Sequence, residues 1–161
     1  MNKLEPYSKN WQILYKIESE KIREVLVGAV TDIQHIGSTS IPNMKAKPII
    51  DIAAMVDSFD KIEDLIQRLS DIGYVYYQQK SSSERYFFEK NDAYHLSITI
   101  PTVSFRRRQI LFRDYLIEHP EIAKEYEILK ESLLNKSVDG TSGYIEGKTE
   151  FVNKVLKLAD I

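Results

Sequence analysis

The chain has 161 residues, 43% of them hydrophobic, which is enough to bury one sizeable core, so a single domain over residues 1–161 is expected. Its 22 Lys and Arg residues against 24 Asp and Glu residues give a formal charge of -2, so the whole surface is not expected to attract nucleic acid, although local basic patches are left open. The chain has no cysteine, which excludes disulfides, a thiol nucleophile and a cysteine-ligated zinc site, and suits a reducing compartment.

Neither the start of the chain nor any later segment predicts export or membrane anchoring. Residues Met1 to Trp11 carry charges and a proline, and no stretch approaches the roughly 18 apolar residues that would span a bilayer. The aromatic side chains are spread along the chain, which is typical of core packing rather than of a stacking platform for single-stranded nucleic acid. We therefore expect a cytoplasmic protein with no membrane partner.

The first half of the chain predicts a helix, two strands and a second helix. Ser8 is placed to cap an amphipathic helix and Gly28 to end it. Residues 31–36 predict a short strand, and residues 48–56 a nearly continuous apolar one. Helical spacing of apolar residues returns over residues 58–73 and predicts a crossover helix.

Three further strands are predicted in the second half of the chain, which then turns helical. The strands cover residues 74–78, 84–90 and 94–100. His119-Pro120 separates the first two helices, because the residue before a proline avoids the α conformation whereas proline fits the first helical turn. A last helix is expected over residues 144–158, after a loop rich in glycine and serine at 137–143. The order of elements predicts one α/β domain with a helical C-terminal part.

A glycine followed by three hydroxyl residues, Gly37-Ser38-Thr39-Ser40, lies directly after the first predicted strand. Glycine lets the backbone bend closely, and a turn of this kind exposes backbone N–H groups and the Ser38 hydroxyl to an anion. Turns of this composition also serve merely to connect strands. An anion cradle and a simple connection are both left open.

One acid, Asp51, interrupts the apolar strand at residues 48–56. An unpaired charge there would cost several kcal/mol if it were buried, so the carboxylate needs a partner. A structural interpretation pairs it with Lys47, Arg85 or a backbone amide. A functional interpretation pairs it with a divalent cation that holds a nucleotide or phosphate. The residues alone leave the two interpretations open.

These residues resemble a known family. A Gly-Ser turn followed by an aspartate on an apolar strand is similar to the nucleotidyltransferase superfamily. Segments 35–42 and 47–52, His-Ile-Gly-Ser-Thr-Ser-Ile-Pro and Lys-Pro-Ile-Ile-Asp-Ile, resemble the GrpB family of nucleotidyltransferase-like proteins. Similar blocks follow in order along the chain: Pro6-Tyr7, Trp11, Tyr86-Phe87-Phe88, His95-Leu96, Gln109 to Leu116 and Tyr144 to Lys148. The resemblance implies a nucleotidyltransferase-like mixed sheet flanked by helices, which binds a nucleotide or other phosphorylated ligand.

The sequence departs from the pattern of active nucleotidyltransferases at the second metal carboxylate, which they place two residues after the first on the same strand face. That position is Ala53 here, so the paired-acid metal clamp is absent. GrpB-like sequences also often carry a glycine where Asn43 stands and a second histidine where Ser97 stands. Asn43 can still take a positive φ, whereas Ser97 is a poorer metal or proton-transfer group than histidine, which leaves His95 to act alone.

Side chains alternate along strands, so three polar residues can meet if their strands lie side by side. In that case Asp51, Glu89 and His95 form a mixed oxygen and nitrogen site for Mg²⁺ or another divalent cation. Asp51 and His95 are then the expected catalytic residues. His35 is expected to orient the Gly37-Ser38 turn through a hydrogen bond.

The cations of the chain suggest a phosphate site and an alternative to it. The run Arg106-Arg107-Arg108 is typical of a solvated helix face, and one of these arginines can instead help Lys47 and Lys148 to capture phosphate. Arg113-Asp114 fits either a surface ion pair or the wall of a cleft. The full expected phosphate-binding set is Gly37, Ser38, Thr39, Ser40, Lys47, Arg85 and Lys148.

Two functions follow from this pattern. The first is an enzyme-like site with Ser38 and neighbouring amides on phosphate and Asp51 on a divalent cation, catalysing nucleotidyl or phosphoryl transfer. The second is a non-catalytic ligand-binding or regulatory module that has kept the Gly-Ser cradle after losing the paired acids, as Ala53 indicates.

Overall fold

The computed structural model describes residues 3–136 and 143–159, which form a mixed sheet with helices on both of its faces. The elements in chain order are α1 (Asn10–Val25), β1 (Val30–Ile36), η1 (Ser38–Ser40), β2 (Ile50–Val56), α2 (Ile62–Ser70), β3 (Val75–Tyr76), η2 (Gln78–Lys80), β4 (Arg85–Lys90), β5 (Tyr94–Thr99), α3 (Val103–Phe105), η3 (Arg106–Leu111), α4 (Phe112–Glu118), α5 (Pro120–Lys136) and α6 (Tyr144–Ala159). Most of the predicted loop at 137–143 lies outside the described residues.

The sheet has five strands in the order β1-β2-β5-β4-β3. β2 runs parallel to β5, and the other neighbouring strands are antiparallel. α2 carries the chain from β2, near one edge, to β3 at the other edge. The prediction of a mixed α/β fold is therefore confirmed, and β2, the strand that carries Asp51, has a neighbour on each side.

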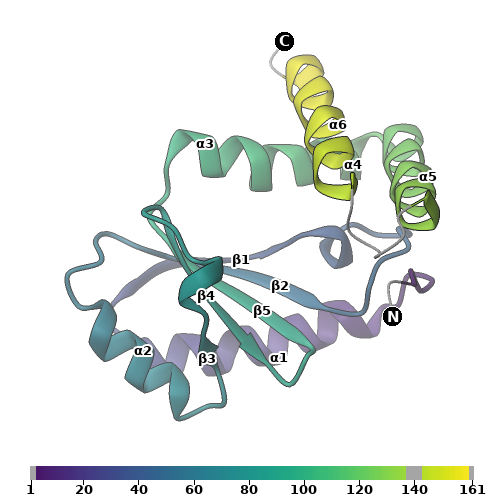
Figure 1. The fold of residues 1–161 in the computed structure, drawn as a ribbon. Coiled ribbons are helices and arrows are strands. Elements are labelled where there is room, and N and C mark those ends of the chain that lie inside the picture. The colour runs from purple at the N-terminus through teal and green to yellow at the C-terminus, as the bar shows by residue number, and fades with distance from the viewer. Residues whose placement is uncertain (1–2, 137–142, 160–161) are drawn as a thin grey trace.

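The two faces of the sheet are covered by different parts of the chain. α1 and α2 pack on one face, and the segment from α3 to α6 covers the other (Figure 1). The first face holds the larger hydrophobic core, which includes Ile22, Leu69, Phe88 and Leu96. The helices of the second face form a smaller core of their own, centred on Leu116 and Val155. The functional residues predicted from the sequence lie between the sheet and this second group of helices.

Most element boundaries follow the predicted signals. The Ser8 hydroxyl accepts a hydrogen bond from the Asn10 N–H at 3.2 Å, and Gly28 follows α1 with a φ of +86°. α4 ends at Glu118 and α5 begins at Pro120, as the His119-Pro120 break predicted. Within the described residues, no helix combines the length and apolarity needed to cross a membrane.

Two predicted elements differ from the structure. The strand predicted over residues 74–78 is reduced to Val75–Tyr76, because the chain turns into the short helix η2 immediately afterwards. The regular helix predicted after Ser104 contains six residues of π-helix, Arg106–Leu111, a wider winding that apolar spacing does not reveal. Such segments occur frequently at functional sites, and this one lies against the cavity described below.

One charge on α1 interrupts an otherwise apolar helix face. The Glu18 side chain is 2% exposed and lies between α1 and the sheet. Its Oε2 accepts hydrogen bonds from the Tyr74 hydroxyl and from Lys90 Nζ, each at 2.8 Å. This buried acid is therefore paired within the fold, as buried charges must be.

Candidate functional site

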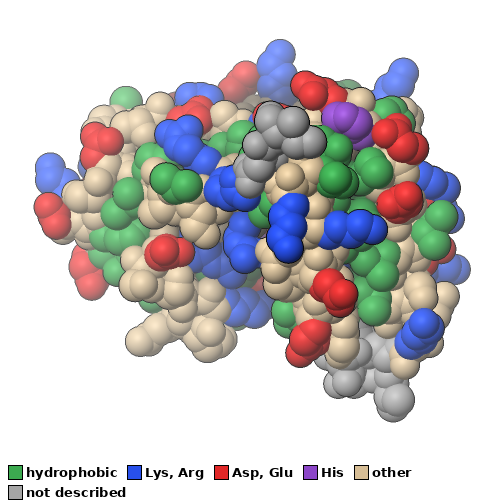
Figure 2. Space-filling model, turned by 90° about the horizontal axis from the view of Figure 1, so that it is seen from above, with side chains coloured by type: hydrophobic (Ala, Val, Ile, Leu, Met, Phe, Trp, Pro, Cys, Tyr) green, Lys and Arg blue, Asp and Glu red, His purple; other side chains and the backbone are tan. Residues whose placement is uncertain are grey.

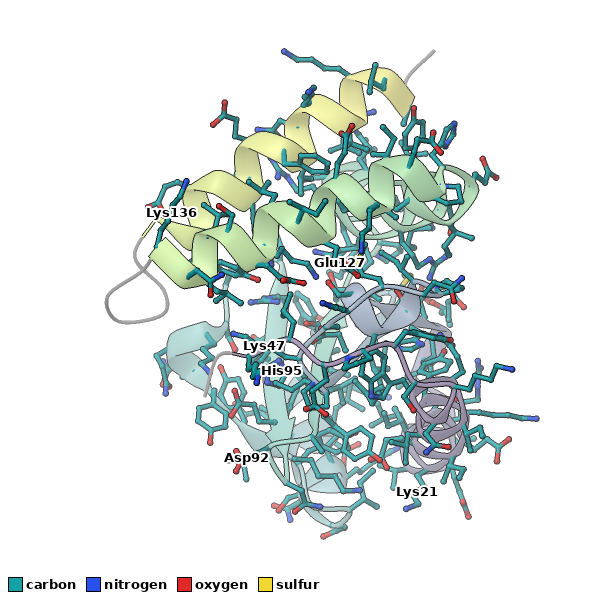
Figure 3. The ribbon with its side chains drawn as sticks, turned by 90° about the vertical axis from the view of Figure 1, so that its right-hand side faces the viewer. Lys21, Lys47, Asp92, His95, Glu127 and Lys136 are labelled. Atoms are coloured by element: carbon teal, nitrogen blue, oxygen red, sulfur yellow. The ribbon has the colours of Figure 1, made fainter. Side chains whose placement is uncertain are left out.

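A cavity of about 510 Å³ lies between the second face of the sheet and the C-terminal helices. Its wall is formed by the end of β1 with η1, by β2, β4 and β5, and by residues of η3, α4, α5 and α6. Figure 3 shows two lining residues, Lys47 and His95, in the region between the sheet and α5 and α6. The volume is in the range of about 300–1,000 Å³ that is usual for small-molecule sites.

The turn after β1 forms part of the cavity wall. Gly37 has a φ of +75°, and a Cβ at this position would overlap Asp51 Oδ2, so only glycine fits there. The hydroxyl of Ser40 donates a hydrogen bond to the Gly37 carbonyl, and the Ser40 N–H bonds the same oxygen at 3.1 Å. Gly37, Ser38 and Thr39 line the cavity, whereas Ser40 is buried and outside its lining.

His35 supports this turn from behind, as the sequence predicted. Its Nε2 lies 3.0 Å from Thr39 Oγ1, and its Nδ1 lies 3.1 Å from Gln12 Oε1. The Tyr15 ring stacks on the imidazole at 4.6 Å between centroids. Burial lowers the pKa of His35 to about 4, and so the ring is neutral and positions the turn at ordinary pH.

Asp51, His95 and Glu89 form one row across three neighbouring strands. The sheet register pairs Asp51 on β2 with His95 on β5, and His95 with Glu89 on β4. Asp51 Oδ1 lies 3.3 Å from His95 Nδ1, and Glu89 Oε1 lies 3.6 Å from His95 Nε2. The strand order assumed from the sequence is thus confirmed. The partner of Asp51 is His95, not Lys47 or Arg85, and the Asp51 side chain is 36% exposed rather than buried.

The row does not fit a paired-acid metal clamp. The His95 ring stands between the two carboxylates, and Glu89 also binds Lys80 at 2.7 Å. Within residues 3–136 and 143–159, no group of three His, Asp or Glu side chains is arranged to hold a metal ion. Magnesium needs several oxygen ligands in near-octahedral geometry. The divalent cation at Asp51, Glu89 and His95 stays a prediction.

The position of the missing acid is occupied by small residues and approached by a guanidinium. Ala53 is paired in register with Ser97 on β5. Arg85 Nη1 lies 3.4 Å from the Ser97 hydroxyl, and its guanidinium stacks over the Phe87 ring at 5.0 Å. Arg85 and Ser97 both line the cavity, so a cation lies one strand away from the position where the metal clamp would have its second carboxylate.

A buried lysine on α5, which the sequence analysis did not single out, forms the floor of the cavity. Lys130 is 2% exposed, and its Nζ donates a hydrogen bond to Ser38 Oγ at 2.5 Å. The Tyr126 ring lies 4.8 Å from the ammonium group. Burial, with a contribution from Lys148, lowers the pKa of Lys130 to about 7. Its spacing from Ala123 and Tyr126 places it on the buried face of α5, a helical pattern that could have revealed it.

Two further lysines converge on the same cavity from different elements. Lys47 Nζ lies 5.7 Å and Lys148 Nζ 5.0 Å from the centre of the Tyr144 ring. Burial lowers the pKa of Lys148, whereas Asp51 opposes this effect. Figure 2 shows Lys and Arg side chains gathered toward the middle of the face seen there, with Asp and Glu mainly farther out. Both lysines were predicted to bind phosphate, and the structure brings them together.

Two arginines of the C-terminal half, Arg108 and Arg113, line the cavity. Arg108 is exposed and lines the cavity, which favours the phosphate interpretation of the arginine run for this residue. Arg113 donates from Nη1 to Gln34 Oε1 at 2.9 Å and to the His35 carbonyl at 2.8 Å. It also pairs with Asp114 at 2.9 Å, so Arg113 belongs both to an ion pair and to the cavity wall.

The GrpB protein family matches residues 2–158, nearly the whole chain. The chain belongs to the GrpB family. The conserved protein GrpB from Enterococcus faecalis has a crystal structure similar to this GrpB chain, with a TM-score of 0.84, 30% identity and coverage of 98% of this chain and 96% of that one. UPF0157 protein YqkA of Bacillus subtilis is 36% identical over 149 residues, which are 91% of this chain and 43% of that protein. The chain thus spans less than half the length of this relative.

A looser structural likeness is to a poly(U) polymerase. The Cid1 poly(U) polymerase, in a crystal structure bound to MgATP, matches this GrpB chain with a TM-score of 0.48 and 11% identity, over 81% of this chain and 46% of that one. A likeness of this degree supports no conclusion about function.

Proposed function

We propose that the cavity of this GrpB-family protein binds a phosphorylated small molecule, with a nucleotide as the type that the Gly-Ser turn favours. The observation that carries the proposal is the buried ammonium group of Lys130 on the Ser38 hydroxyl, with Lys47 and Lys148 beside it. Charge-assisted contacts from ammonium groups and a serine hydroxyl match phosphate oxygens. Gly37 and Ser38 supply the cradle, and Arg85 and Arg108 add positive charge at its edge.

Two functions fit the binding of a phosphorylated ligand at this site. One is nucleotidyl or phosphoryl transfer, in which Asp51 and His95 hold or move a proton next to the bound phosphate, at the atoms Oδ1 and Nδ1. The cations around Ser38 would stabilise charge on the phosphate oxygens, because such reactions depend on positioning and charge neutralisation. The closeness of Asp51 to Gly37 supports this function.

The other is binding without catalysis, in a module that regulates or carries a ligand. Ala53 favours binding without catalysis, because its side chain has no atom that could ligate a metal and is 0% exposed. The cradle and the lysines do not depend on the missing acid, so binding can persist where metal-assisted catalysis has been lost.

Isothermal titration with nucleoside triphosphates tests the shared proposal. We expect wild-type protein to bind and Lys130→Met to lose at least about tenfold in affinity, since one charge-assisted contact is worth about 1.5–3 kcal/mol. Lys136→Met, on an exposed lysine of the same helix, is the matched control and should bind as wild type. Unchanged affinity of Lys130→Met contradicts the proposed site.

A second measurement separates the two functions. Pyrophosphate release, measured with and without magnesium for wild type and Asp51→Ala, detects transfer. Release that depends on Asp51 supports the enzyme and excludes the purely binding module. Tight binding that does not need magnesium and persists in Asp51→Ala, with no pyrophosphate release, supports the module and removes the metal-assisted reaction.

A further inference from the structure

We infer that the cavity takes a ligand with several negative charges, a polyphosphate chain rather than a single phosphate, and that side-chain cations supply the counter-charge without a divalent metal. The inference rests on the proposed function and adds to it the charge of the ligand and the independence from metal. It starts from an imbalance of charge among the residues that line the cavity.

The lining residues include many cations and one acid. Asp51 is the only Asp or Glu among the described residues that line the cavity, and His95 Nδ1 lies 3.3 Å from its carboxylate. Five of the lining cations each have no carboxylate of the described part of the chain within ion-pair distance: Lys47, Arg85, Arg108, Lys130 and Lys148. A single phosphate would leave most of this positive charge uncompensated.

The cations are arranged at different depths. Lys130 is buried at the floor beside Ser38, Lys47 and Lys148 are half-buried beside Tyr144, and Arg85 and Arg108 are exposed. One phosphate on Ser38 can contact the floor, whereas successive phosphates extend past the middle pair toward the arginines. The arrangement therefore favours an elongated anion whose terminal phosphate lies innermost.

Repulsion among the three lysines favours a ligand with several negative charges. Burial is the main reason that the pKa values of Lys130 and Lys148 are lowered, and repulsion adds to it: Lys148 and Lys47 lower the pKa of Lys130 further, and Lys47 lowers that of Lys148. Glu127 on α5 and Asp51 on β2 act in the opposite direction and do not cancel the burial. A polyanion between the three amines removes the repulsion and stabilises all three in their charged form.

The same cations disfavour a metal at this site. Arg85 Nη1 lies 3.4 Å from the hydroxyl of Ser97, the residue paired in register with Ala53, so positive charge lies one strand away from the position where a metal clamp requires a second carboxylate. Like charges repel strongly in a partly enclosed site. Neutralisation of the phosphates by Lys47, Lys130 and Lys148 therefore makes a divalent cation unnecessary for binding.

Titration calorimetry with inorganic phosphate, pyrophosphate and tripolyphosphate tests the inference, each in EDTA and in magnesium at matched ionic strength. We expect affinity to rise along the series, with tripolyphosphate at least about tenfold tighter than phosphate in EDTA. Magnesium should weaken binding, because it competes with the lysines for the same oxygens. Equal affinity for phosphate and tripolyphosphate, or binding of tripolyphosphate only with magnesium, overturns the inference.

Substitutions of lysines test whether tripolyphosphate binds in the cavity. Lys148→Met should lower tripolyphosphate affinity by about tenfold, and Lys154→Met, on an exposed lysine of the same helix, should leave it unchanged. Lys47→Met gives the same test from another element if Lys148→Met does not fold. An equal loss in Lys154→Met shows a nonspecific charge effect and contradicts the inference. Binding of phosphate or nucleotide without a gain along the series refutes this inference alone, whereas no binding of any phosphate compound refutes the proposed function.

Discussion

On the face of the sheet covered by α1 and α2, the buried acid Glu18 is held by Lys90 and by the Tyr74 hydroxyl. On the opposite face the buried base Lys130 is held by the Ser38 hydroxyl, the Met44 sulfur and the Tyr126 ring, and no described carboxylate pairs with it. Both side chains are 2% exposed. A buried charge that the fold itself needs is paired within the fold, whereas one left unpaired beside a cavity is available to a ligand.

The largest change in unfolding free energy is expected on the face covered by α1 and α2, where Glu18 is paired with Lys90. Lys90→Met removes the cation that hydrogen-bonds the buried Glu18 carboxylate and leaves only the exposed Lys21, 3.9 Å away, so it should lower the free energy of unfolding by about 3–5 kcal/mol. Urea unfolding measures the loss, and Lys61→Met, on an exposed lysine, is the control. Ligand binding should be unaffected, because Lys90 is not among the residues that line the cavity. A loss comparable with that of the control would show that Glu18 does not need its partner.

A smaller effect is expected at the turn that faces the cavity. Gly37→Ala introduces a side chain at positive φ and a collision with Asp51, and we expect a loss of about 2–4 kcal/mol in unfolding free energy together with weaker ligand binding. Gly28→Ala is a matched control, because its φ is +86° but a Cβ there meets nothing within 4 Å. The difference between the two variants isolates the collision from the backbone strain. Equal losses would mean that the contact with Asp51 carries no energy.

The site was predictable where local pattern determines it. The Gly37-Ser38 turn lies directly after a strand, and His35, two residues earlier, hydrogen-bonds back to Thr39 within the same turn. Alternation along strands correctly placed Asp51, Glu89 and His95 on one face once the strand order was assumed. These features depend on the residues' own segments and on the two-residue period of strands.

Contacts between distant segments were less predictable. Lys130 touches Ser38 across 92 positions of sequence, and its burial depends on how α5 packs over the turn. The structural interpretation paired Asp51 with Lys47, Arg85 or a backbone amide, but parallel pairing of β2 with β5 brings His95 next to it. Helical spacing does place Lys130 on the buried face of α5. That spacing does not reveal whether a carboxylate lies across from it.

The smallest effect is expected for Lys130→Met, which should change the free energy of unfolding in the opposite direction from Lys90→Met. Without ligand, Lys130→Met should raise the free energy of unfolding by about 1–3 kcal/mol near pH 7, because it removes a buried charge that has no carboxylate partner among the described residues. Its pKa in the folded protein is about 7, below the ordinary 10.5, so the folded state binds fewer protons than the unfolded state between these values. Wild-type stability therefore carries the full cost of the charge below pH 7 and recovers as the pH rises toward 10.5.

The stability difference between Lys130→Met and wild type should accordingly be largest below pH 7 and shrink as the pH rises. Urea unfolding from about pH 6 to about pH 9 measures it, and groups such as Lys47, Lys148, Asp51 and Glu127 are present in both proteins. Lys136→Met should show no such trend. If Lys130→Met instead loses stability at every pH, as Lys90→Met is expected to do, Lys130 belongs to the fold's own structure. The cavity would then lose the unpaired charge on which its assignment as an anion site depends.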